Sequence, residues 1–518
     1  MNAPAVLHWS ALGSAVAFGL LTPTVRARAD EPVGEFAQHA DVGDPTIAGS
    51  ASYDPDTQHY RFAAGGTNMW GTSDQFHFAW NRMKGDFIVR VRFEFVGQGV
   101  DPHRKVGWIA RSSLAADSPY ADACVHGDGL TSLQYRRTQG GETQEVALPL
   151  RGGDVIQLER RGRTYLFSSA RYGEPFVTRE IELELGEEVL VGLFLCSHNP
   201  QVKEEAIFKD VRIIRPPKTG YVPYRDYIGA QLEVLNVFTG QLSVVHRSPE
   251  AFEAPNWMPD LRTLLVNVSG PGPNKGRLQR FDLVTKQTAP FDTGFATRNN
   301  NDHVLSFDGR QLGISHHSAD DDGRSAVYRL PATGGTPVRV TPKSPSYFHG
   351  WSPDGKWLVY TGGRKERPDG PDKYDIYKIS LDGGDEVRLT DSPGLNDGPE
   401  FSPEGRYIYF NSTRTGRMQL WRMNADGSGQ EQLTDDGLNN WFPHVSPDGK
   451  WIVFLSYGAD VRPDDHPYYR QVYLRMMPAD GGEPRVIAYV FGGQGTMNVP
   501  SWSPDGVRIA FVSNTAIE

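Results

Sequence analysis

The sequence predicts an all-β protein of two domains, a jelly-roll or β-sandwich domain followed by a six-bladed β-propeller. The 518 residues include 56 Gly and 37 Pro, a composition typical of many short strands joined by tight turns. A Ser-Pro-Asp-Gly motif recurs in the C-terminal half, whereas alternating strands without a repeat fill the N-terminal half. We therefore predict a sandwich over 35–215, a linker over 216–221 and a propeller over 222–518.

The N-terminus has the features of a secretory signal peptide over residues 1–29. A short apolar stretch runs from Ala11 to Leu21, and Ala27-Arg28-Ala29 then offers a small-residue cleavage site. The stretch is too short to span a bilayer. The region before it carries His8 but no Lys or Arg, so a disordered leader is the alternative. The signal peptide predicts a periplasmic or secreted protein without a membrane span.

The charge balance argues against nucleic acid as a partner. The chain has 53 Lys and Arg against 63 Asp and Glu, which gives a formal net charge of -10. Binding to phosphate backbones needs a basic face. The sequence also lacks a nucleotide-binding loop, a serine-elbow motif and an H-E-x-x-H zinc motif. A nucleotide cofactor is therefore not expected.

Strands of alternating polarity define the N-terminal domain. Apolar side chains face one way and charged ones the other along 87–95, where Phe87, Val89 and Val91 alternate with Arg90 and Arg92. Three stretches, Val106–Arg111, Gly192–Ser197 and Phe208–Ile213, resemble the concanavalin-like and laminin-G-like sandwiches. The resemblance implies glycan binding more than catalysis.

Two Cys-x-His pairs lie on strands of this domain, Cys124-Val125-His126 and Cys196-Ser197-His198. A spacing of two places both side chains of a pair on one face of a strand. Zinc ligation, a Cys124–Cys196 disulfide and two buried thiols are the open alternatives. The polar side chains of this predicted sheet face would suit a sugar; they are His126, Asp128, Gln134, Arg136 and His198.

The Ser-Pro-Asp-Gly motif marks the blades of the propeller. Full copies start at Ser352, Ser402 (with Glu in place of Asp), Ser446 and Ser503, each followed by a β-rich run. Shortened copies occur at Pro259-Asp260 and Asp308-Gly309. Pro presets φ for the first turn position, Asp caps its own backbone, and Gly accepts a positive φ. Six turns in phase predict six blades.

The ring is expected to close by pairing its two ends. The last repeat reaches Glu518 after only two strands' worth of sequence. The stretches 231–237 and 241–245, which flank Thr239-Gly240, precede the first repeat and have the pattern of a hairpin. This hairpin would complete the sixth blade and leave no raw sheet edge there.

The segment 250–518 resembles the PD40 (WD40-like) repeats of TolB-type propellers. Families with such blades include the Tol–Pal component TolB, peptidase-associated propellers and oligogalacturonate lyases. The resemblance therefore implies the fold strongly, while both scaffolds and enzymes remain open.

Polar and aromatic side chains precede each turn motif, at the start of the innermost strand. We expect them to converge at one mouth of the central channel. The candidate catalytic residues are His303, His349, His444, Asp302, Asp397 and Glu400, and the candidate substrate-binding residues are Asn301, Tyr347, Asn440, Trp441 and Asn498.

This set of side chains suits several roles. The three histidines and the carboxylates could hold a divalent metal such as Mn, Ca or Zn, or act as general acid and base. The resemblance to oligogalacturonate lyases implies a manganese ion held by histidines at a propeller mouth. The alternatives are polar groups that satisfy strand ends, and a mouth that docks a protein.

Two arginines follow the second strands of their blades, Arg364 and Arg414. Their guanidinium groups would suit the carboxylate of a uronate. The alternative for both is an ion pair on the surface.

The leading hypothesis is an exported carbohydrate-active or carbohydrate-binding protein, with glycan lyase or hydrolase chemistry at the propeller mouth. The alternative is a non-catalytic, TolB-like periplasmic scaffold that docks a protein partner. The enzyme hypothesis requires imidazoles and carboxylates within reach of one metal or one substrate. The scaffold hypothesis requires an open mouth with an apolar rim.

Overall fold

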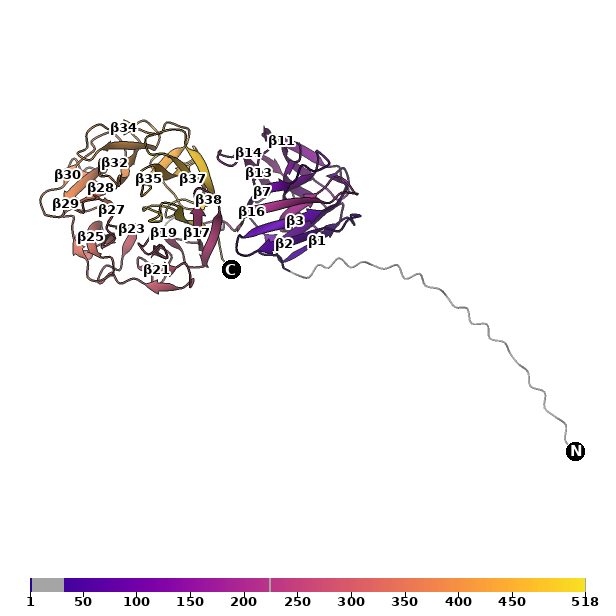
Figure 1. Cartoon of the computed structure of the whole chain (residues 1–518), viewed down its shortest axis with the longest axis horizontal. Helices are drawn as coiled ribbons and strands as arrows, with labels where there is room; N and C mark the ends of the chain where they lie inside the picture. The colour runs from indigo at the N-terminus through magenta and orange to yellow at the C-terminus, as the bar shows by residue number, and fades with distance from the viewer. Residues whose placement is uncertain (2–31, 223–224, 518) are drawn as a thin grey trace.

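The computed structural model describes residues 1, 32–222 and 225–517, so the predicted signal peptide lies outside the described residues apart from Met1. Two β-rich domains lie side by side (Figure 1), and the only helix of the described residues is a short 3-10 turn at Ala319–Asp321. The prediction of an all-β chain is confirmed.

The N-terminal domain contains two seven-stranded sheets and a small hairpin. The first sheet has the order β1 (Gln38–Val42), β6 (Phe76–Lys84), β15 (Glu188–Cys196), β8 (Lys105–Arg111), β9 (Tyr120–His126), β10 (Leu130–Arg136) and β11 (Gln144–Arg151). The second has the order β14 (Val177–Glu182), β13 (Thr164–Ala170), β12 (Val155–Arg161), β7 (Phe87–Val96), β16 (Glu204–Ile214), β3 (His59–Ala64) and β2 (Ser50–Asp54). The hairpin joins β4 (Met69–Trp70) to β5 (Ser73–Asp74).

One apolar core draws on both large sheets. Phe87 and Val89 of β7 belong to the same buried cluster as Trp108 of β8 and Leu193 of β15. The apolar face predicted for β7 is therefore the buried one. The arrangement is sandwich-like, and its relation to the concanavalin and laminin-G classes stays a prediction.

Six small sheets form the C-terminal propeller, and the predicted number of blades is confirmed. The first three blades are β19 (Phe252–Trp257), β20 (Thr263–Val268), β21 (Leu278–Asp282), β22 (Thr288–Pro290); β23 (Asn299–Leu305), β24 (Gln311–His317), β25 (Ser325–Pro331), β26 (Val338–Arg339); and β27 (Ser346–Trp351), β28 (Trp357–Lys365), β29 (Asp372–Ser380), β30 (Val387–Arg388). The next two are β31 (Asn396–Phe401), β32 (Tyr407–Ser412), β33 (Gln419–Asn424), β34 (Glu431–Gln432); and β35 (Asn439–Val445), β36 (Trp451–Tyr457), β37 (Arg470–Pro478), β38 (Arg485–Gly492).

The sixth blade joins the two ends of the propeller sequence, as predicted. β17 (Ala230–Asn236) pairs with β39 (Arg508–Asn514) on one side and with β18 (Leu242–Ser248) on the other. A bridge between Trp502 and Ile509 adds the inner edge of this blade. The pairing locks the ring.

The turn motif is built as its residue types predict. In the third blade the Ser352 hydroxyl donates to Asp354 Oδ1 at 2.5 Å and accepts from the Trp357 amide at 2.9 Å. Gly355 has φ 68°, which a side chain would strain. The same Ser–Asp bond recurs at Ser306, Ser446 and Ser503.

A β-bulge interrupts the inner strand of each of the first five blades. The register shifts lie between residues 253 and 256, 299 and 303, 348 and 350, 397 and 400, and 441 and 444. A bulge bends a strand and redirects its side chains. The candidate site residues therefore sit where each strand changes the direction of its side chains.

The two domains share a packed interface. Val155 and Ala170 of the N-terminal domain cluster with Tyr473, Val486 and Tyr489 of the fifth blade. The amide of Val486 also donates to the carbonyl of Gly173 at 2.8 Å.

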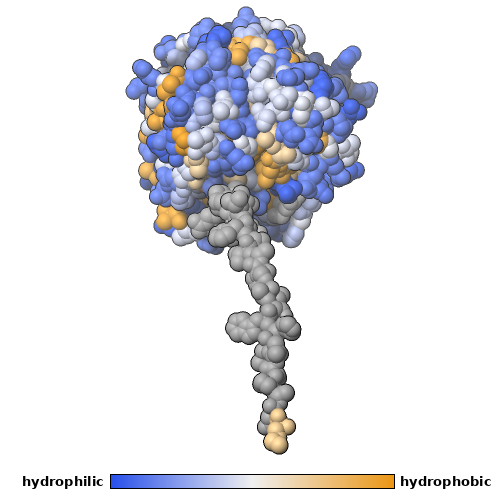
Figure 2. Space-filling model, turned by 90° about the vertical axis from the view of Figure 1, so that its right-hand side faces the viewer, coloured by the Kyte–Doolittle hydropathy of each residue, from blue (hydrophilic) through white to orange (hydrophobic). Residues whose placement is uncertain are grey.

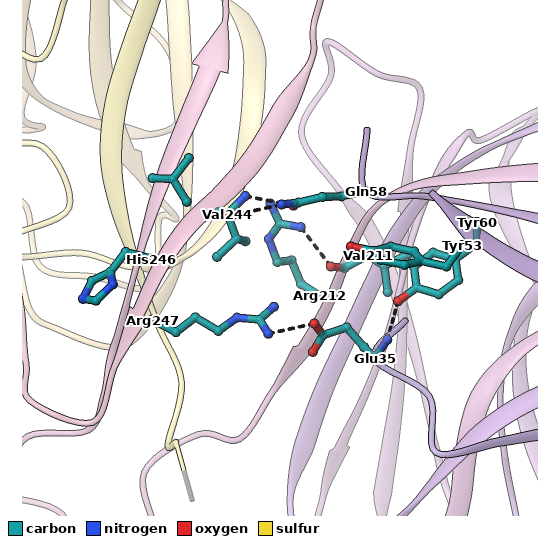
Figure 3. A pocket seen from close by; sticks show the side chains of 10 residues that line it. Glu35, Tyr53, Gln58, Tyr60, Val211, Arg212, Val244, His246 and Arg247 are labelled. Carbon is teal, nitrogen blue, oxygen red and sulfur yellow. Dashed lines mark hydrogen bonds and ion pairs between the residues drawn. The ribbon is translucent and has the colours of Figure 1, made fainter. Parts of the chain in front are cut away.

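A cleft of about 370 Å³ lies between the N-terminal domain and the closing blade (Figure 3). The Gln58 side-chain amide donates to the Val244 carbonyl at 2.9 Å and accepts from its N–H at 3.0 Å. Gln58 thus caps the outer edge strand β18 as a neighbouring strand would. Arg247 and Glu35 close the rim of the cleft with an ion pair at 2.7 Å.

The face of the molecule drawn in Figure 2 is mainly polar. Figure 2, viewed towards the side that lies on the right in Figure 1, shows scattered hydrophobic groups on a largely hydrophilic face. Within the described residues, no helix has the length and apolar character needed to cross a membrane.

Candidate functional site

The predicted channel cluster separates into two His–carboxylate pairs and one isolated histidine. His349 Nε2 lies 3.5 Å from Asp397 Oδ1, and His444 Nδ1 lies 2.7 Å from Glu400 Oε2. All four side chains are largely buried. The bulges of β27, β31 and β35 bring these pairs together from adjacent blades.

His303 does not join either pair. Its side chain is fully buried, and its Nε2 lies 3.5 Å from the Leu265 carbonyl of the preceding blade. Burial lowers the pKa of His303 to about 4. His303 is therefore a neutral imidazole between two blades, although it shares its position relative to the turn motif with His349.

Charges in the channel shift the pKa values of the remaining groups. Burial raises the pKa of Asp302 to about 6, against the opposing effect of His349. Burial alone would lower the pKa of His349, but Asp397 and Asp302 outweigh it and raise that pKa above its usual value. The pKa of Asp397 is lowered because His349 outweighs its burial. His349 and Asp397 are thus an ion pair with Asp302 as a third acidic neighbour.

Three of the predicted binding residues, Asn440, Trp441 and Asn498, are buried. Asn440 is buried and donates to Gln419, and Trp441 is buried with His466 stacked on it at 4.5 Å. Asn498 Oδ1 accepts from the Gly495 amide at 2.7 Å. Tyr347 is partly exposed, and its ring centroid lies 6.4 Å from that of Tyr374.

Arg364 and Arg414 are engaged inside their own blades. Arg364 forms a 2.7 Å ion pair with Glu386. Arg414 donates to Asn396 Oδ1 at 2.8 Å and to Gln430 Oε1 at 2.6 Å. Arg364 is thus in an ion pair, but a largely buried one and not the surface pair given as the alternative, since the two side chains are 16% and 6% exposed. In this conformation neither guanidinium is left open for a uronate.

The turn-side end of the channel opens into a cavity of about 410 Å³, which we call the turn-side cavity. Every blade contributes to its wall. The lining includes Trp257, Pro259, Phe307, His349, Trp351, Glu400, Pro403, Pro447, Trp502 and Pro504. Proline and aromatic side chains form most of this set, with His349 and Glu400 as its charged or ionisable members apart from Asp308.

Asn300 and Asn301 line a different cavity, on the side where the inner strands begin. The turn-side cavity and this second one share no lining residue. The predicted residues do not meet at a single mouth: His349 and Glu400 line the turn-side cavity, Asn301 lines the second cavity, and the other predicted channel residues line neither.

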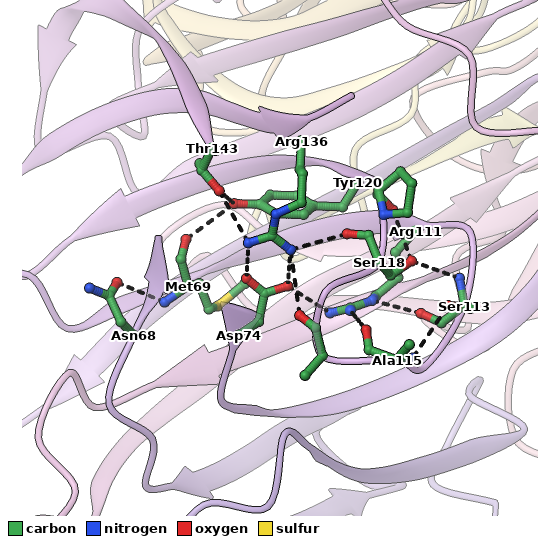
Figure 4. A network of polar contacts seen from close by, with 12 residues as sticks. Asn68, Met69, Asp74, Arg111, Ser113, Ala115, Ser118, Tyr120, Arg136 and Thr143 are labelled. Atoms are coloured by element: carbon green, nitrogen blue, oxygen red, sulfur yellow. Dashed lines mark hydrogen bonds and ion pairs between the residues drawn. The ribbon is translucent and has the colours of Figure 1, made fainter. Parts of the chain in front are cut away.

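The predicted sugar-binding face of the N-terminal domain is largely covered. Arg136 is fully buried and holds Asp74 through bonds of 2.9 and 2.8 Å, and Arg111 approaches the same carboxylate (Figure 4). The β4–β5 hairpin carries Asp74 onto this face, so Arg136 cannot reach a ligand in solution. Gln134 is also buried and accepts from the Lys105 ammonium at 3.0 Å.

His126 and His198 lie near each other at the edge of that face, with ring centroids 6.4 Å apart. Burial, with help from the Lys105 charge, lowers the pKa of each to about 3. Cys124 and Cys196 are both free and buried. Of the three alternatives, the structure therefore agrees with two buried thiols. Among the described residues there is no group of three or more His, Cys, Asp or Glu that could hold a metal ion.

Glu253 was missed by the sequence reasoning. It stands seven residues before Asp260, as Asn301 stands seven before Asp308 and Asp397 seven before Glu404. The shortened turn motif of the first blade hid this correspondence. Counting back seven residues from each turn acid would have found it.

We expect Glu253→Gln to raise the free energy of unfolding at pH 8 by about 1–3 kcal/mol. Burial raises the pKa of Glu253 to about 7. A carboxyl whose pKa is raised by folding contributes stability below its unfolded value near 4.5, and that contribution is lost as the pH rises through 7. Glutamine keeps the size without titrating.

Urea unfolding at pH 4 and pH 8 measures this difference. The exposed Glu483 supplies a matched control, Glu483→Gln, for which we expect the same stability change at both pH values. If the free energies of unfolding of wild type and Glu253→Gln differ by the same amount at pH 4 and pH 8, the prediction is contradicted.

Comparisons with known proteins agree with the propeller assignment. The profile of the TolB beta propeller domain, PD40, matches residues 367–463. An uncharacterized protein of Agrobacterium fabrum is 48% identical over 290 residues, which cover 56% of this chain and 94% of that protein. A solved structure of a candidate TolB from Agrobacterium tumefaciens is 47% identical, covers 56% of this chain and 100% of that chain, and superposes with a TM-score of 0.52. A TolB structure from Acinetobacter baumannii is 18% identical, with a TM-score of 0.39 over 51% of this chain and 64% of that chain.

Proposed function

The chain belongs to the TolB-like PD40 β-propeller family, and on this premise we propose that it is a protein-interaction module that docks a partner at the turn-side cavity. The observation that supports the proposal is the apolar rim to which all six blades contribute. Contiguous exposed apolar surface with polar surroundings is typical of protein interaction sites. The scaffold hypothesis requires an open mouth with an apolar rim, and the proline and aromatic side chains of this lining support it.

The rim and the floor of the cavity suggest what docks there. Phe307 is 50% exposed, and proline and tryptophan side chains line the same cavity. His349 and Glu400 lie among the same lining residues. A partner segment with an apolar side chain for the rim and a hydrogen-bonding group for the floor would complement both. We propose that the protein works in the periplasm or outside the cell, where its partner would be another exported protein.

Acid–base glycan chemistry in the channel is a second candidate function. One observation favours it: Asp302, His349 and Asp397 are coupled, and Asp302 has a pKa of about 6. Groups that titrate near neutral pH suit proton transfer. The metal-dependent form of this candidate lacks a ligand group among the described residues.

We expect Phe307→Ala to weaken peptide binding by about 10-fold or more, as loss of a central aromatic contact does at interfaces. Peptides would be selected from a random 12-residue phage library on the full chain, and affinities measured by fluorescence anisotropy. The matched control is Phe238→Ala, because Phe238 is 59% exposed and lies in the turn between β17 and β18, outside this lining. Peptides that bind both variants equally, or a library that yields no binder, would overturn the proposal.

A further inference from the structure

A second cavity opens on the side where the inner strands begin, and we call it the strand-start cavity. Its volume is about 410 Å³. It lies between the first two blades and the loops that carry Tyr468 and Gln494. The proposed docking function makes no use of it, because none of its residues lines the turn-side cavity.

Glu253 anchors the deep wall of this cavity. The Tyr468 hydroxyl donates to Glu253 Oε2 at 3.0 Å, and the Asn301 amide approaches the same oxygen at 3.4 Å. Gly495 makes room for the carboxyl group, since a Cβ atom at that position would lie 2.2 Å from Glu253 Oε2. Its φ of 85° also favours glycine.

Two buried acceptors of the cavity lack a donor. Asn299 is 5% exposed, and its Nδ2 donates to the carbonyls of Gly276 and Ala296 at 3.0 and 2.8 Å. Those bonds fix its Oδ1 as the remaining acceptor, which has no partner. Gln494 Oε1 is likewise buried without a partner. Buried acceptors without donors are costly, and a ligand with hydroxyl groups would satisfy them.

The rim of the cavity is positively charged. Lys275 and Arg298 both line it and both are exposed. Among the residues described, neither has a carboxylate within ion-pairing distance, although the Lys275 ammonium lies 5.5 Å from the Tyr227 ring centroid. The rim can therefore receive an anionic group. The unpaired acceptor oxygens of Asn299 and Gln494 can accept hydrogen bonds from donors on a ligand.

We propose that the strand-start cavity binds a sugar acid, with its carboxylate between Lys275 and Arg298 and its hydroxyl groups donating to Asn299 and Gln494. A carboxylate with several hydroxyl groups is the small-molecule class that carries both features at once. The ring of Tyr227 adds an aromatic side chain to the lining, of the kind that packs against sugar rings.

Isothermal titration of the full chain with D-glucuronate, D-gluconate, D-glucose and acetate tests the proposal. We expect both acids to bind about 10-fold or more tightly than glucose, which lacks the charge, and than acetate, which lacks the hydroxyl groups. Equal binding of glucose would remove the role of the cations, and equal binding of acetate would reduce the site to a plain anion contact. Either result, or no binding of either acid, would overturn the proposal.

Matched variants locate the site. Lys275→Ala with Arg298→Ala should weaken D-glucuronate binding by about 10-fold or more. The control pair is Arg310→Ala with Lys450→Ala, whose side chains are 83% and 73% exposed and which lie next to turn motifs. We expect the control pair to bind as wild type does. An equal loss of D-glucuronate affinity in both double variants, or no loss in the Lys275→Ala, Arg298→Ala variant, would contradict the assignment. Binding of the phage-selected peptides tests the turn-side cavity separately.

Discussion

Asp74→Ala is expected to lower the free energy of unfolding of the N-terminal domain by about 3–5 kcal/mol, because it leaves buried charge uncompensated. Asp74, Arg111 and Arg136 have side chains with no exposed surface. Arg136 donates to both carboxylate oxygens, and Arg111 lies 3.5 Å away (Figure 4). Removal of the carboxylate would leave two buried guanidinium groups without a negatively charged partner.

The pKa of Arg111 shows how incompletely this network offsets its burial. Burial lowers that pKa to about 10 even with Asp74 beside it. Without Asp74 the cost of keeping Arg111 charged would increase. The hairpin β4–β5, which Arg136 also holds through the Gly71 carbonyl at 3.0 Å, would lose its main tie to the sheet.

Guanidinium chloride unfolding followed by tryptophan fluorescence measures the change. The control is Asp480→Ala, since the Asp480 side chain is 99% exposed and such changes stay within about 0.5 kcal/mol. A cost below about 1 kcal/mol for Asp74→Ala would show that water or a rearranged hairpin satisfies both arginines.

The propeller could be predicted from the sequence because its turns and hairpins are specified by residues that lie close together in the chain. Each turn motif encodes its own geometry, as the Ser352–Asp354 bond and the positive φ of Gly355 show. Ring closure also followed from local pattern, since a hairpin precedes the first motif and a half blade follows the last. These features depend on residues near each other in the chain.

The site could only be predicted in part, because its chemistry depends on neighbours from other blades. His303 and His349 share one position relative to the turn motif, yet His303 meets the Leu265 carbonyl and His349 meets Asp397. No spacing rule within one repeat distinguishes these environments. The bulges add a second difficulty, since they redirect side chains where period-two alternation would fix them.

The N-terminal domain shows the same limit in a different form. Alternation correctly grouped Gln134 and Arg136 on one sheet face, but it could not show what covers that face. Asp74, more than 60 residues earlier in the chain, returns on a hairpin and neutralises Arg136 there. A polar sheet face is therefore evidence for a polar partner, and here the partner of Arg136 is internal.

Glu233→Ala is expected to cost about 3–5 kcal/mol and to uncouple the two domains, because it breaks a buried ion pair between them. Arg212 of β16 lies 2.5 Å from Glu233 of β17, and their side chains are 6% and 2% exposed. The Ser513 hydroxyl donates to the same carboxylate at 2.5 Å, which ties it to β39. One carboxylate thus joins the last strand of the sandwich-like domain to the strands that close the ring.

The pH dependence has a defined sign. Burial would raise the pKa of Glu233, but Arg212 outweighs burial and lowers it below the ordinary value of 4.5. A carboxyl with a lowered folded pKa stabilises above its unfolded pKa, and that contribution is lost as the pH falls through the folded value. The difference between wild type and Glu233→Ala should therefore be full at pH 7 and shrink below about pH 4.5.

Differential scanning calorimetry at pH 7 tests both effects. Wild type should unfold with its domains coupled through this interface, and Glu233→Ala should show a separate, lower transition. The control is Glu205→Ala, because its ion pair with Arg61 is 39% and 54% exposed and such pairs contribute at most about 1 kcal/mol. Arg212→Met combined with Glu233→Met should recover part of the loss, since Arg212 is then not left charged without its carboxylate partner. If Glu233→Ala unfolds with the same transitions as the Glu205→Ala control, the interface is held by its apolar contacts around Tyr473 and Tyr489 instead.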